Sequence, residues 1–395
     1  MVKETHVTLS LPKGMKQTEI GLIPEDWEVV KIKEISSIKT GSKNTQDRIE
    51  NGRYPFFVRS QTIERIKSYS YDEEAVLTAG DGVGVGKVFH YVNEKFDLHQ
   101  RVYLMHQFRK DVSGFYFFKY FQNNFLGRIM QMTAKSSVDS VRMETISEMP
   151  ITLPPLAEQE AIASALSDCD AWIESLEAVI AKKRLIKQGA MQDLLTPKED
   201  WEVKKLGEVA DFFKGTGLPK SQLDEGGELK CIHYGELFTK YRELIGSIRS
   251  RTNSTDISFL SKFNDVLIPT SDVTPRGLAT ASCIKEDGVI LGGDILVIRF
   301  KTLIDGVFFS YFITNNKEEV LKYVSGSTVY HLYGSELSNL IFYFPKSLSE
   351  QTRIATVLSD MDAELEALGQ KLNKARQIKQ GMMQELLTGR VRLVS

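Results

Sequence analysis

The sequence predicts a mixed α/β protein with two tandem globular domains and two long helices, packed as an antiparallel coiled coil with pseudo-twofold symmetry. The first observation behind this fold class is an internal repeat. Residues 158–196 align without a gap on residues 350–388, and 22 of the 39 positions are identical. Repeats of this fidelity mark a duplicated structural unit, which has to be identified before any single motif is interpreted.

The second observation is the apolar spacing inside each copy, which advances by alternating steps of four and three residues. This period is typical of coiled coils, so each copy is predicted to be one helix of about 40 residues, roughly 60 Å long. The first helix follows Pro154-Pro155 and the second follows the capping box of residues 347–350. The predicted coiled-coil core is Ile162, Leu166, Cys169, Ile173, Leu176, Ile180, Ile354, Leu358, Met361, Leu365, Leu368 and Leu372.

The third observation is a looser repeat, which covers the segments outside the two helices. The phrase around Trp27 returns around Trp201, and the stretch ending at Asp81 returns in the stretch ending at Asp272. The sequence therefore divides into an extension at 1–20, a globular domain at 21–155, a helix at 156–196, a second globular domain at 197–345, and a second helix with a tail at 346–395. The second domain carries an insertion around residues 240–255.

Within each domain, short β-branched and aromatic runs separated by Gly, Asn and Asp indicate strands, for example at 54–58, 87–92 and 289–300. Helices are expected near 115–124 and 307–316, with their aromatic side chains in the core and not available for stacking on bases. An antiparallel second helix would return the chain towards the first domain, so we expect the helix pair to act as a spacer between two recognition modules.

Composition excludes several classes of protein. No apolar run approaches the ~18 residues that a membrane span requires, and the first residues lack a signal-peptide core. The three cysteines are far apart in sequence, which indicates a reducing cytoplasm, and no metal site is expected; the segment Cys231 to His233 is the nearest candidate. A net charge of −2 argues against strong non-specific binding of nucleic acid, so any DNA-binding face must be local.

No catalytic residues are predicted. The glycine-rich stretch 81–88 lacks the first glycine and the Ser or Thr of a Walker A loop, and it also lacks the dinucleotide-binding spacing. Pro154-Pro155 lacks the neighbours of an amino-methyltransferase motif. The stretch at 81–88 is therefore interpreted as a tight hairpin or as a turn that approaches a ligand closely.

Glycines stand at the same place in both helices, although each costs about 1 kcal/mol relative to alanine. A glycine in a helix permits the close approach of another helix, so Gln188, Gly189, Gln380 and Gly381 are predicted to contact either the sister helix or a separate subunit.

These features together resemble the specificity subunits of type I restriction-modification enzymes. The resemblance rests on the two Trp-Glu-Val openings, the Leu-Pro-Pro-Leu-Ala-Glu-Gln-Glu segment at 153–160 and the two Ile-Lys-Gln-Gly helix segments, and it covers nearly the whole chain. It implies two target-recognition domains, each reading half of an asymmetric bipartite DNA sequence, and helices that also dock two modification subunits.

The resemblance transfers target-reading positions only approximately, because these residues differ between members. We expect Arg and Gln to pair with base edges, and Lys and Ser to hold phosphates. The predicted DNA-binding residues are Lys43, Arg59, Ser60, Gln61, Lys87, Arg101, Lys135 and Arg142 in the first domain, and Lys214, His233, Tyr234, Thr270, Ser271, Arg276, Tyr330 and His331 in the second.

The implied partners are double-stranded DNA, two modification subunits and, through the complex, restriction subunits, with no membrane. S-adenosylmethionine, ATP and Mg are expected on those partner subunits, and no cofactor is expected on this chain. Two alternatives stay open. The first alternative to a specificity subunit is an enzyme by itself, either a methyltransferase or a nuclease. The second is a non-catalytic protein-protein scaffold with two binding globules on a coiled-coil rod.

Overall fold

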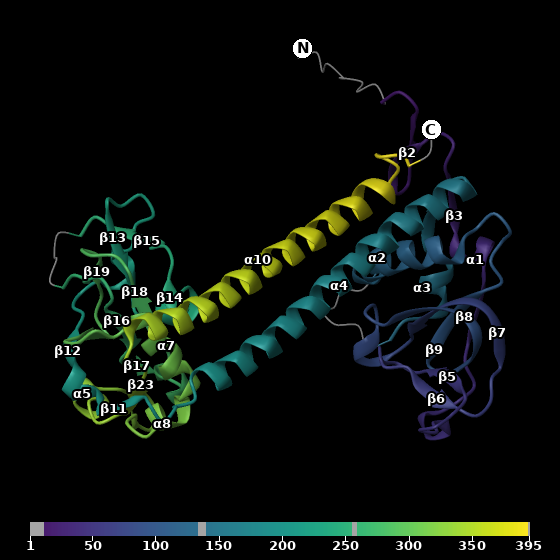
Figure 1. Cartoon of the computed structure of the whole chain (residues 1–395). Helices are drawn as coiled ribbons and strands as arrows, with labels where there is room; N and C mark the ends of the chain where they lie inside the picture. Colours follow the sequence, from purple (N-terminus) through teal and green to yellow (C-terminus); the bar gives the residue numbers. More distant parts are fainter. Residues whose placement is uncertain (1–11, 133–139, 255–258, 394–395) are drawn as a thin grey trace, which may run out of the picture. The chain divides into compact units, whose positions relative to one another are not determined.

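The computed structural model describes residues 12–132, 140–254 and 259–393, and it divides into two compact units. Unit 1 comprises residues 1–176 and 371–395, and unit 2 comprises residues 177–370. Each unit therefore holds one globular domain and a part of each long helix. These helices, α4 (Leu156–Leu194) and α10 (Leu348–Leu386), have 39 residues each and confirm the predicted long helices (Figure 1).

The globular domain of unit 1 is built on a six-stranded sheet in the order β4-β9-β7-β8-β5-β6, in which only β5 and β8 pair in parallel. These strands are β4 (Ser37–Thr40), β5 (Tyr54–Phe57), β6 (Glu64–Ile66), β7 (Tyr71–Ala79), β8 (Phe89–Leu98) and β9 (Val102–His106). Two short antiparallel pairs accompany the sheet: β1 (Met15–Thr18) with β2 (Gly21–Pro24), and β3 (Glu28–Lys31) with β10 (Pro150–Leu153). Residues 15–18, assigned to an extension from sequence, therefore belong to a hairpin.

The core of unit 1 lies between the sheet and helix α2 (Gly114–Met132), whose Phe117, Phe121 and Phe125 are fully buried. This confirms that the aromatic cluster is core. Ile162 and Leu166 of α4 and Leu386 of α10 join the same core, together with Trp27. The remaining short helices are α1 (Ile32–Ile35), α3 (Met143–Ser147) and the 3₁₀ turns η1 (Thr45–Asp47) and η2 (Gly82–Gly84).

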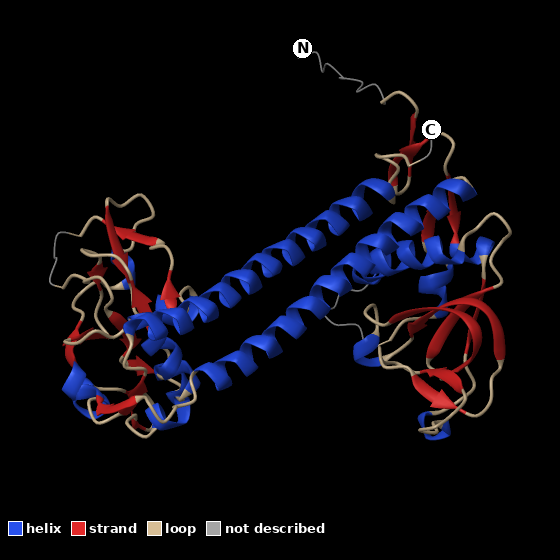
Figure 2. Ribbon diagram, in the orientation of Figure 1, coloured by secondary structure: helices blue, strands red, loops and turns tan. Residues whose placement is uncertain are grey.

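Unit 2 likewise combines strands and helices (Figure 2). Its main sheet has five strands in the order β12-β20-β16-β18-β14. Its strands are β12 (Ala210–Lys214), β14 (Leu244–Ile245), β16 (Val266–Pro269), β18 (Ser282–Ile284) and β20 (Ile295–Phe300). The smaller sheets comprise β11 (Glu202–Lys205) with β23 (Ile341–Phe344), β13 (Leu229–Ile232) with β15 (Ser250–Thr252) and β19 (Ile290–Leu291), and β17 (Ser271–Asp272) with β21 (Ser325–Gly326) and β22 (Tyr330–His331). Strands β14 and β15 lie in the predicted insertion.

The core of unit 2 is centred on α7 (Gly306–Asn315), where Phe308 and Phe309 are fully buried beside Trp201. Ile354 and Leu358 of α10 pack into it, as Ile162 and Leu166 of α4 do in unit 1. The other helical segments are α5 (Leu206–Val209), α6 (Glu236–Thr239), α8 (Lys317–Leu321), α9 (Gly334–Leu337), η3 (Lys220–Gln222) and η4 (Pro275–Leu278).

Ion pairs join α4 and α10 within each unit. In unit 1 the Asp170 carboxylate of α4 lies 2.5 Å from the Lys379 ammonium of α10, and in unit 2 Lys187 of α4 lies 2.6 Å from Asp362 of α10. Asp170 and Asp362 occupy equivalent places in the repeat, and so do Lys187 and Lys379. The two pairs are therefore the same contact with the roles of the two helices exchanged.

The predicted coiled-coil stripe is buried unevenly. Ile162, Leu166, Ile354 and Leu358 are fully buried, but they pack into the cores of the globular domains. Cys169 and Ile180 are also buried, whereas the positions between them and towards the middle of α10 are half-buried: Ile173, Leu176, Met361, Leu365, Leu368 and Leu372. At its ends the stripe is covered by the domains as well as by the end of the sister helix, because both contribute to the same cores.

A buried glutamine fixes the start of each helix to its own domain. The Gln159 side chain accepts a hydrogen bond from the Ser113 amide (2.9 Å) and donates to the Asp111 and Pro154 carbonyls (2.8 Å each). The equivalent Gln351 accepts from the Asp305 amide (2.9 Å) and donates to the Pro345 carbonyl (2.8 Å). Since both side chains are fully buried, their hydrogen bonds hold the helix in a defined direction.

Candidate nucleic-acid interface

The first domain gathers its predicted DNA-binding residues at the ends of the central strands. Arg59 follows β5, Lys87 precedes β8, and Arg101 precedes β9. Lys43 forms an isolated bridge with His99, and the Gln61 side chain donates to the Lys87 carbonyl at 3.2 Å. Ser60 adjoins the same group because it precedes Gln61. Arg142 also adjoins it, because it follows Val141, whose amide donates to the Gly80 carbonyl. Lys135 lies outside the described residues.

The centre of this group is the carboxylate of Asp81, just after β7. Its Oδ1 accepts from Arg59 at 2.6 Å and its Oδ2 accepts from Arg101 at 2.9 Å. The arginine side chains stay 43% and 62% exposed, whereas that of Asp81 is 18% exposed. One carboxylate thus holds two guanidinium groups in fixed positions while leaving both accessible, and charge-assisted contacts of this kind restrict orientation strongly.

His99 lies beneath this group as a neutral side chain at pH 7. Burial lowers the pKa of His99, and the neighbouring positive charge of Arg59 lowers it further. The ring Nδ1 accepts a hydrogen bond from the Arg101 amide at 3.0 Å. His99 therefore fixes the backbone of an arginine without adding charge to the surface.

The second domain places most of its predicted residues around β17 and β22. Ser271 pairs with His331, and Asp272 pairs with Tyr330. The Thr270 amide donates to the Asp294 carbonyl, and the Lys214 ammonium lies 3.5 Å from the Asp294 carboxylate.

Tyr234 and Ser271 line one open cavity of about 310 Å³, and the ring of His233 lies 4.7 Å from that of Tyr234. Arg276, in η4, forms an exposed ion pair with Glu318. The second set is therefore held around a groove lined by an aromatic ring, with fewer cations than the first.

Sequence reasoning missed the acidic residues that organise both sites. Asp81 orients two arginines, and Asp272 accepts from the Val273 amide and the Thr274 hydroxyl, both at 2.7 Å. The signal was available, because Asp81 and Asp272 occupy the same position in the loose repeat. A carboxylate repels phosphates, but it can position the cations that bind them.

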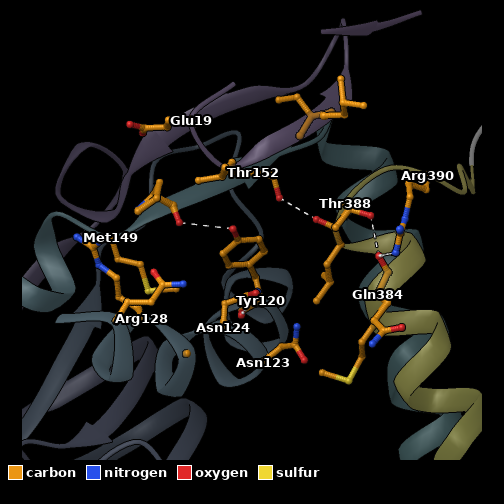
Figure 3. Close-up of a pocket in the computed structure, with 18 residues that line it drawn as sticks. Glu19, Tyr120, Asn123, Asn124, Arg128, Met149, Thr152, Gln384, Thr388 and Arg390 are labelled. Atoms are coloured by element: carbon orange, nitrogen blue, oxygen red, sulfur yellow. Dashed lines mark hydrogen bonds between the residues drawn. The ribbon is translucent and has the colours of Figure 1, made fainter. Parts of the chain in front are cut away.

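A separate cavity of about 540 Å³ in unit 1 is lined by the β1–β2 hairpin, α2, the β10 region and the end of α10 (Figure 3). Tyr120, Asn123 and Arg128 of α2 and Gln384 of α10 point towards it. The Arg128 Nη2 donates to the Glu148 carbonyl at 3.3 Å. The predicted DNA-binding residues do not line this cavity, so it is distinct from the Asp81 group.

The helix glycines face open space. A Cβ atom added to Gly189 or to Gly381 would meet no heavy atom within 4 Å, so contact with the sister helix is wrong at both positions. The nearby Ile186 and Ile378, equivalent in the repeat, are 46% and 40% exposed, and Gln188 and Gln380 are exposed too. Each unit therefore presents the same uncovered segment, and contact with a separate subunit stays a prediction.

Within residues 12–132, 140–254 and 259–393, no cluster of three or more His, Cys, Asp or Glu side chains could hold a metal ion. In the same part of the chain, no helix is long and apolar enough to cross a membrane. The three cysteines are buried free thiols.

The family model described as "Type I restriction modification DNA specificity domain" matches residues 24–183 and again residues 198–377. The chain belongs to this family. The two matches coincide with the two copies of the repeat, so this chain is a specificity subunit with two target-recognition domains. The resemblance read from the Trp-Glu-Val and Ile-Lys-Gln-Gly segments is confirmed.

Two archaeal relatives match this specificity subunit over nearly its whole length. The MjaVIII type I restriction enzyme specificity subunit of Methanocaldococcus jannaschii is 26% identical over 94% of both chains. The putative MjaX specificity subunit of the same organism is 28% identical over 96% of this chain and 97% of the relative.

Solved structures share the fold. The S subunit of a type I restriction-modification system from M. genitalium superposes with a TM-score of 0.64 over 96% of this chain and 98% of its own, at 15% identity. A second structure, from a study of complex assembly and conformational transition of the type I R-M system, gives a TM-score of 0.51 over 93% of this chain and 99% of its own, at 14% identity. Identities this low establish the shared fold alone.

Proposed function

We propose that this specificity subunit selects an asymmetric bipartite DNA target, with each domain reading one half. The carrying observation is the Asp81 group, in which one carboxylate at the strand ends orients Arg59 and Arg101, two of the residues predicted from sequence. A guanidinium held in this way pairs bidentately with guanine O6 and N7 in the major groove. Lys43 and Lys87, at the margin of the group, are placed to hold phosphates.

The two half-sites are proposed to differ in sequence because the two groups differ in chemistry. The first centres on two arginines and an acid, whereas the second combines Tyr234, Tyr330 and His331 with a single arginine, Arg276. The helices, by contrast, are copies of one another with 22 of 39 aligned positions identical. An asymmetric target requires two different half-sites. Two copies of one partner require two similar helix surfaces.

We further propose that the Ile186 to Gly189 and Ile378 to Gly381 segments dock two modification subunits. Exposed isoleucines beside uncovered glycines allow a helix to approach closely. The chain itself is proposed to be non-catalytic, so that S-adenosylmethionine, ATP and Mg belong to modification and restriction subunits, and the complex works in the cytoplasm.

Selection from a randomised duplex pool tests the proposal. The chain is incubated with its modification subunit at moderate salt, and bound duplexes are sequenced after several rounds. Enrichment of two short fixed blocks separated by a gap of fixed length is expected. If no sequence is enriched although the modification subunit binds, DNA selection is wrong and the protein-protein scaffold takes its place. Methyl transfer by the purified chain alone would instead support an enzyme.

A further inference from the structure

Each domain carries an exposed valine within two residues of an aspartate in its predicted DNA-binding group. Val83 is 94% exposed and Val273 is 72% exposed, which puts them among the most exposed large apolar residues in the described part of the chain. Val83 follows Asp81 by two residues and Val273 follows Asp272 by one. Single exposed apolar residues are ordinary on protein surfaces. The two valines, however, lie beside the two predicted DNA-binding groups, which calls for an explanation.

Backbone hydrogen bonds fix the loop that carries Val83. The Gly82 carbonyl accepts from the Val85 amide (3.1 Å), and the Gly84 carbonyl accepts from the Val88 amide (2.9 Å). A Cβ at the buried Gly84 would lie 2.7 Å from the Arg59 carbonyl, so the loop packs directly on the strand end that bears Arg59. The backbone therefore projects Val83 from a fixed base next to the Asp81 group.

Val273 is supported in a different way with the same result. The Asp272 carboxylate accepts from the Val273 amide and the Thr274 hydroxyl, and Pro275 begins η4 immediately afterwards. Val273 then lines the open cavity of about 310 Å³ together with Tyr234 and Val329. An apolar side chain and an aromatic ring thus border the site where Ser271 and His331 are paired.

The chemistry of a base edge fits such a side chain. Thymine is the base that presents a methyl group, at C5, in the major groove, and proteins read it by apolar contact. Beside Val83, the side chains of Arg59 and Gln61 are available for polar contacts with neighbouring bases. We propose that Val83 and Val273 each pack against the 5-methyl group of one thymine in their half-sites, so that the two domains share one apolar reading position. This inference rests on the proposed function.

The test uses the complex with the modification subunit and the duplex obtained by selection. Each thymine in the two fixed blocks is replaced singly by deoxyuridine, which removes only the methyl group, and dissociation constants are measured for the wild type and for Val83→Ala and Val273→Ala. One thymine in each block is expected to lose about three- to tenfold in affinity, the effect of about one buried methyl group. Val83→Ala should weaken the thymine duplex by a similar factor and abolish the deoxyuridine effect in one block only, and Val273→Ala in the other.

Leu303→Ala is the matched control, because Leu303 is 79% exposed but lies in the segment between β20 and α7. It should leave all deoxyuridine effects unchanged. The inference is overturned if a fixed block contains no A·T pair, or if valine truncation has no effect. It is equally overturned if truncation weakens thymine and deoxyuridine duplexes alike, which would indicate a wedge between bases. Failure to enrich any bipartite sequence would contradict the proposed function itself, so the two failures are distinguishable.

Discussion

The guanidinium of Arg59 donates a 2.6 Å hydrogen bond to the Asp81 carboxylate, whose second oxygen holds Arg101. Three residues from separate parts of the chain thus form one unit with two positive charges and one negative charge. Asp81 is the least exposed of the three, so its role is to orient the guanidinium groups of Arg59 and Arg101. Discrimination between DNA sequences is therefore expected to depend on Asp81, although its negative charge by itself opposes DNA binding.

Replacing Asp81 by asparagine removes that charge with little change in shape. Both arginines then lose their anionic partner, so binding to random duplex DNA should strengthen, and the slope of log affinity against log salt should steepen by about one. Preference for the selected target should fall about tenfold, since one oriented bidentate contact contributes ~1–3 kcal/mol of discrimination. Fluorescence anisotropy at three salt concentrations measures all of these quantities.

Asp72→Asn is the control for this change, because Asp72 forms an exposed ion pair with Lys95 in the same sheet. It removes the same charge from the domain and should leave discrimination unchanged. Equal losses in both variants would mean that net charge, and not the orientation of Arg59 and Arg101, determines specificity.

Arg392 should stabilise unit 1 by joining the end of the chain to the start of α4. Its guanidinium donates to Glu158 (2.7 Å) and to Asp26 (2.8 Å), and the fully buried Glu158 also accepts from the Trp27 indole (3.0 Å). Arg392→Ala leaves a buried carboxylate with one neutral donor. We expect a loss of about 2 kcal/mol, below the ~3–5 of a fully buried pair because Arg392 is partly exposed.

Hydrogen exchange of peptides spanning residues 24–31 measures this effect locally, without assuming that both units unfold together. The matched change is Arg390→Ala, which removes an exposed pair with Glu385 and should alter exchange little. Unchanged protection in Arg392→Ala would contradict a stabilising role for the terminal contact.

The Asp26 contact predicts a pH dependence. The hydrogen bond from Arg392 lowers the pKa of Asp26 below its ordinary value of 3.8. The stabilisation is therefore fully present above that value and is lost as the pH falls through the lowered native pKa. The difference in melting temperature between the wild type and Asp26→Asn should be constant from pH 5 to 7 and shrink below about pH 4. A difference that grows in acid would refute the assignment.

The uncovered glycines predict a separation of folding from docking. Gly189→Leu together with Gly381→Leu should raise helix stability by about 1 kcal/mol per site, since leucine favours helix more than glycine does. The same change should reduce binding of the modification subunit strongly, measured by sedimentation or calorimetry. Gly369→Leu is the control, because Gly369 also faces open space in α10 but lies outside the Ile378 to Gly381 segment. Full binding by the double variant would remove these segments from the docking surface.

The fold was predictable where the sequence repeats itself. The long helices, the two domains and the aromatic cores around Phe121 and Phe308 follow from periodicity and duplication, because burying an apolar stripe leaves few alternatives. The uneven burial of the stripe was not predictable. Ile162 and Leu358 have the spacing of coiled-coil residues, and spacing alone does not reveal whether a sister helix or a domain covers them.

The candidate site was predictable in its cations and not in its organisation. Arg59 and Arg101 are 42 positions apart in sequence, and only the pairing of β7 with its neighbours brings them to one carboxylate. Gly189 illustrates the opposite limit. Its conspicuous place in a helix predicted a close contact, but the structure leaves that surface open, and contact with another chain stays a prediction.

The most direct measurement of the central claim repeats the duplex selection with each domain altered in turn. One variant combines Arg59→Ala with Arg101→Ala, and the other combines Arg276→Ala with His331→Ala. If each domain reads one half-site, the first variant blurs one fixed block and leaves the second block and the gap unchanged, while the second variant does the reverse. Loss of both blocks in either variant, or of neither in both, would contradict the assignment of one half-site to each domain.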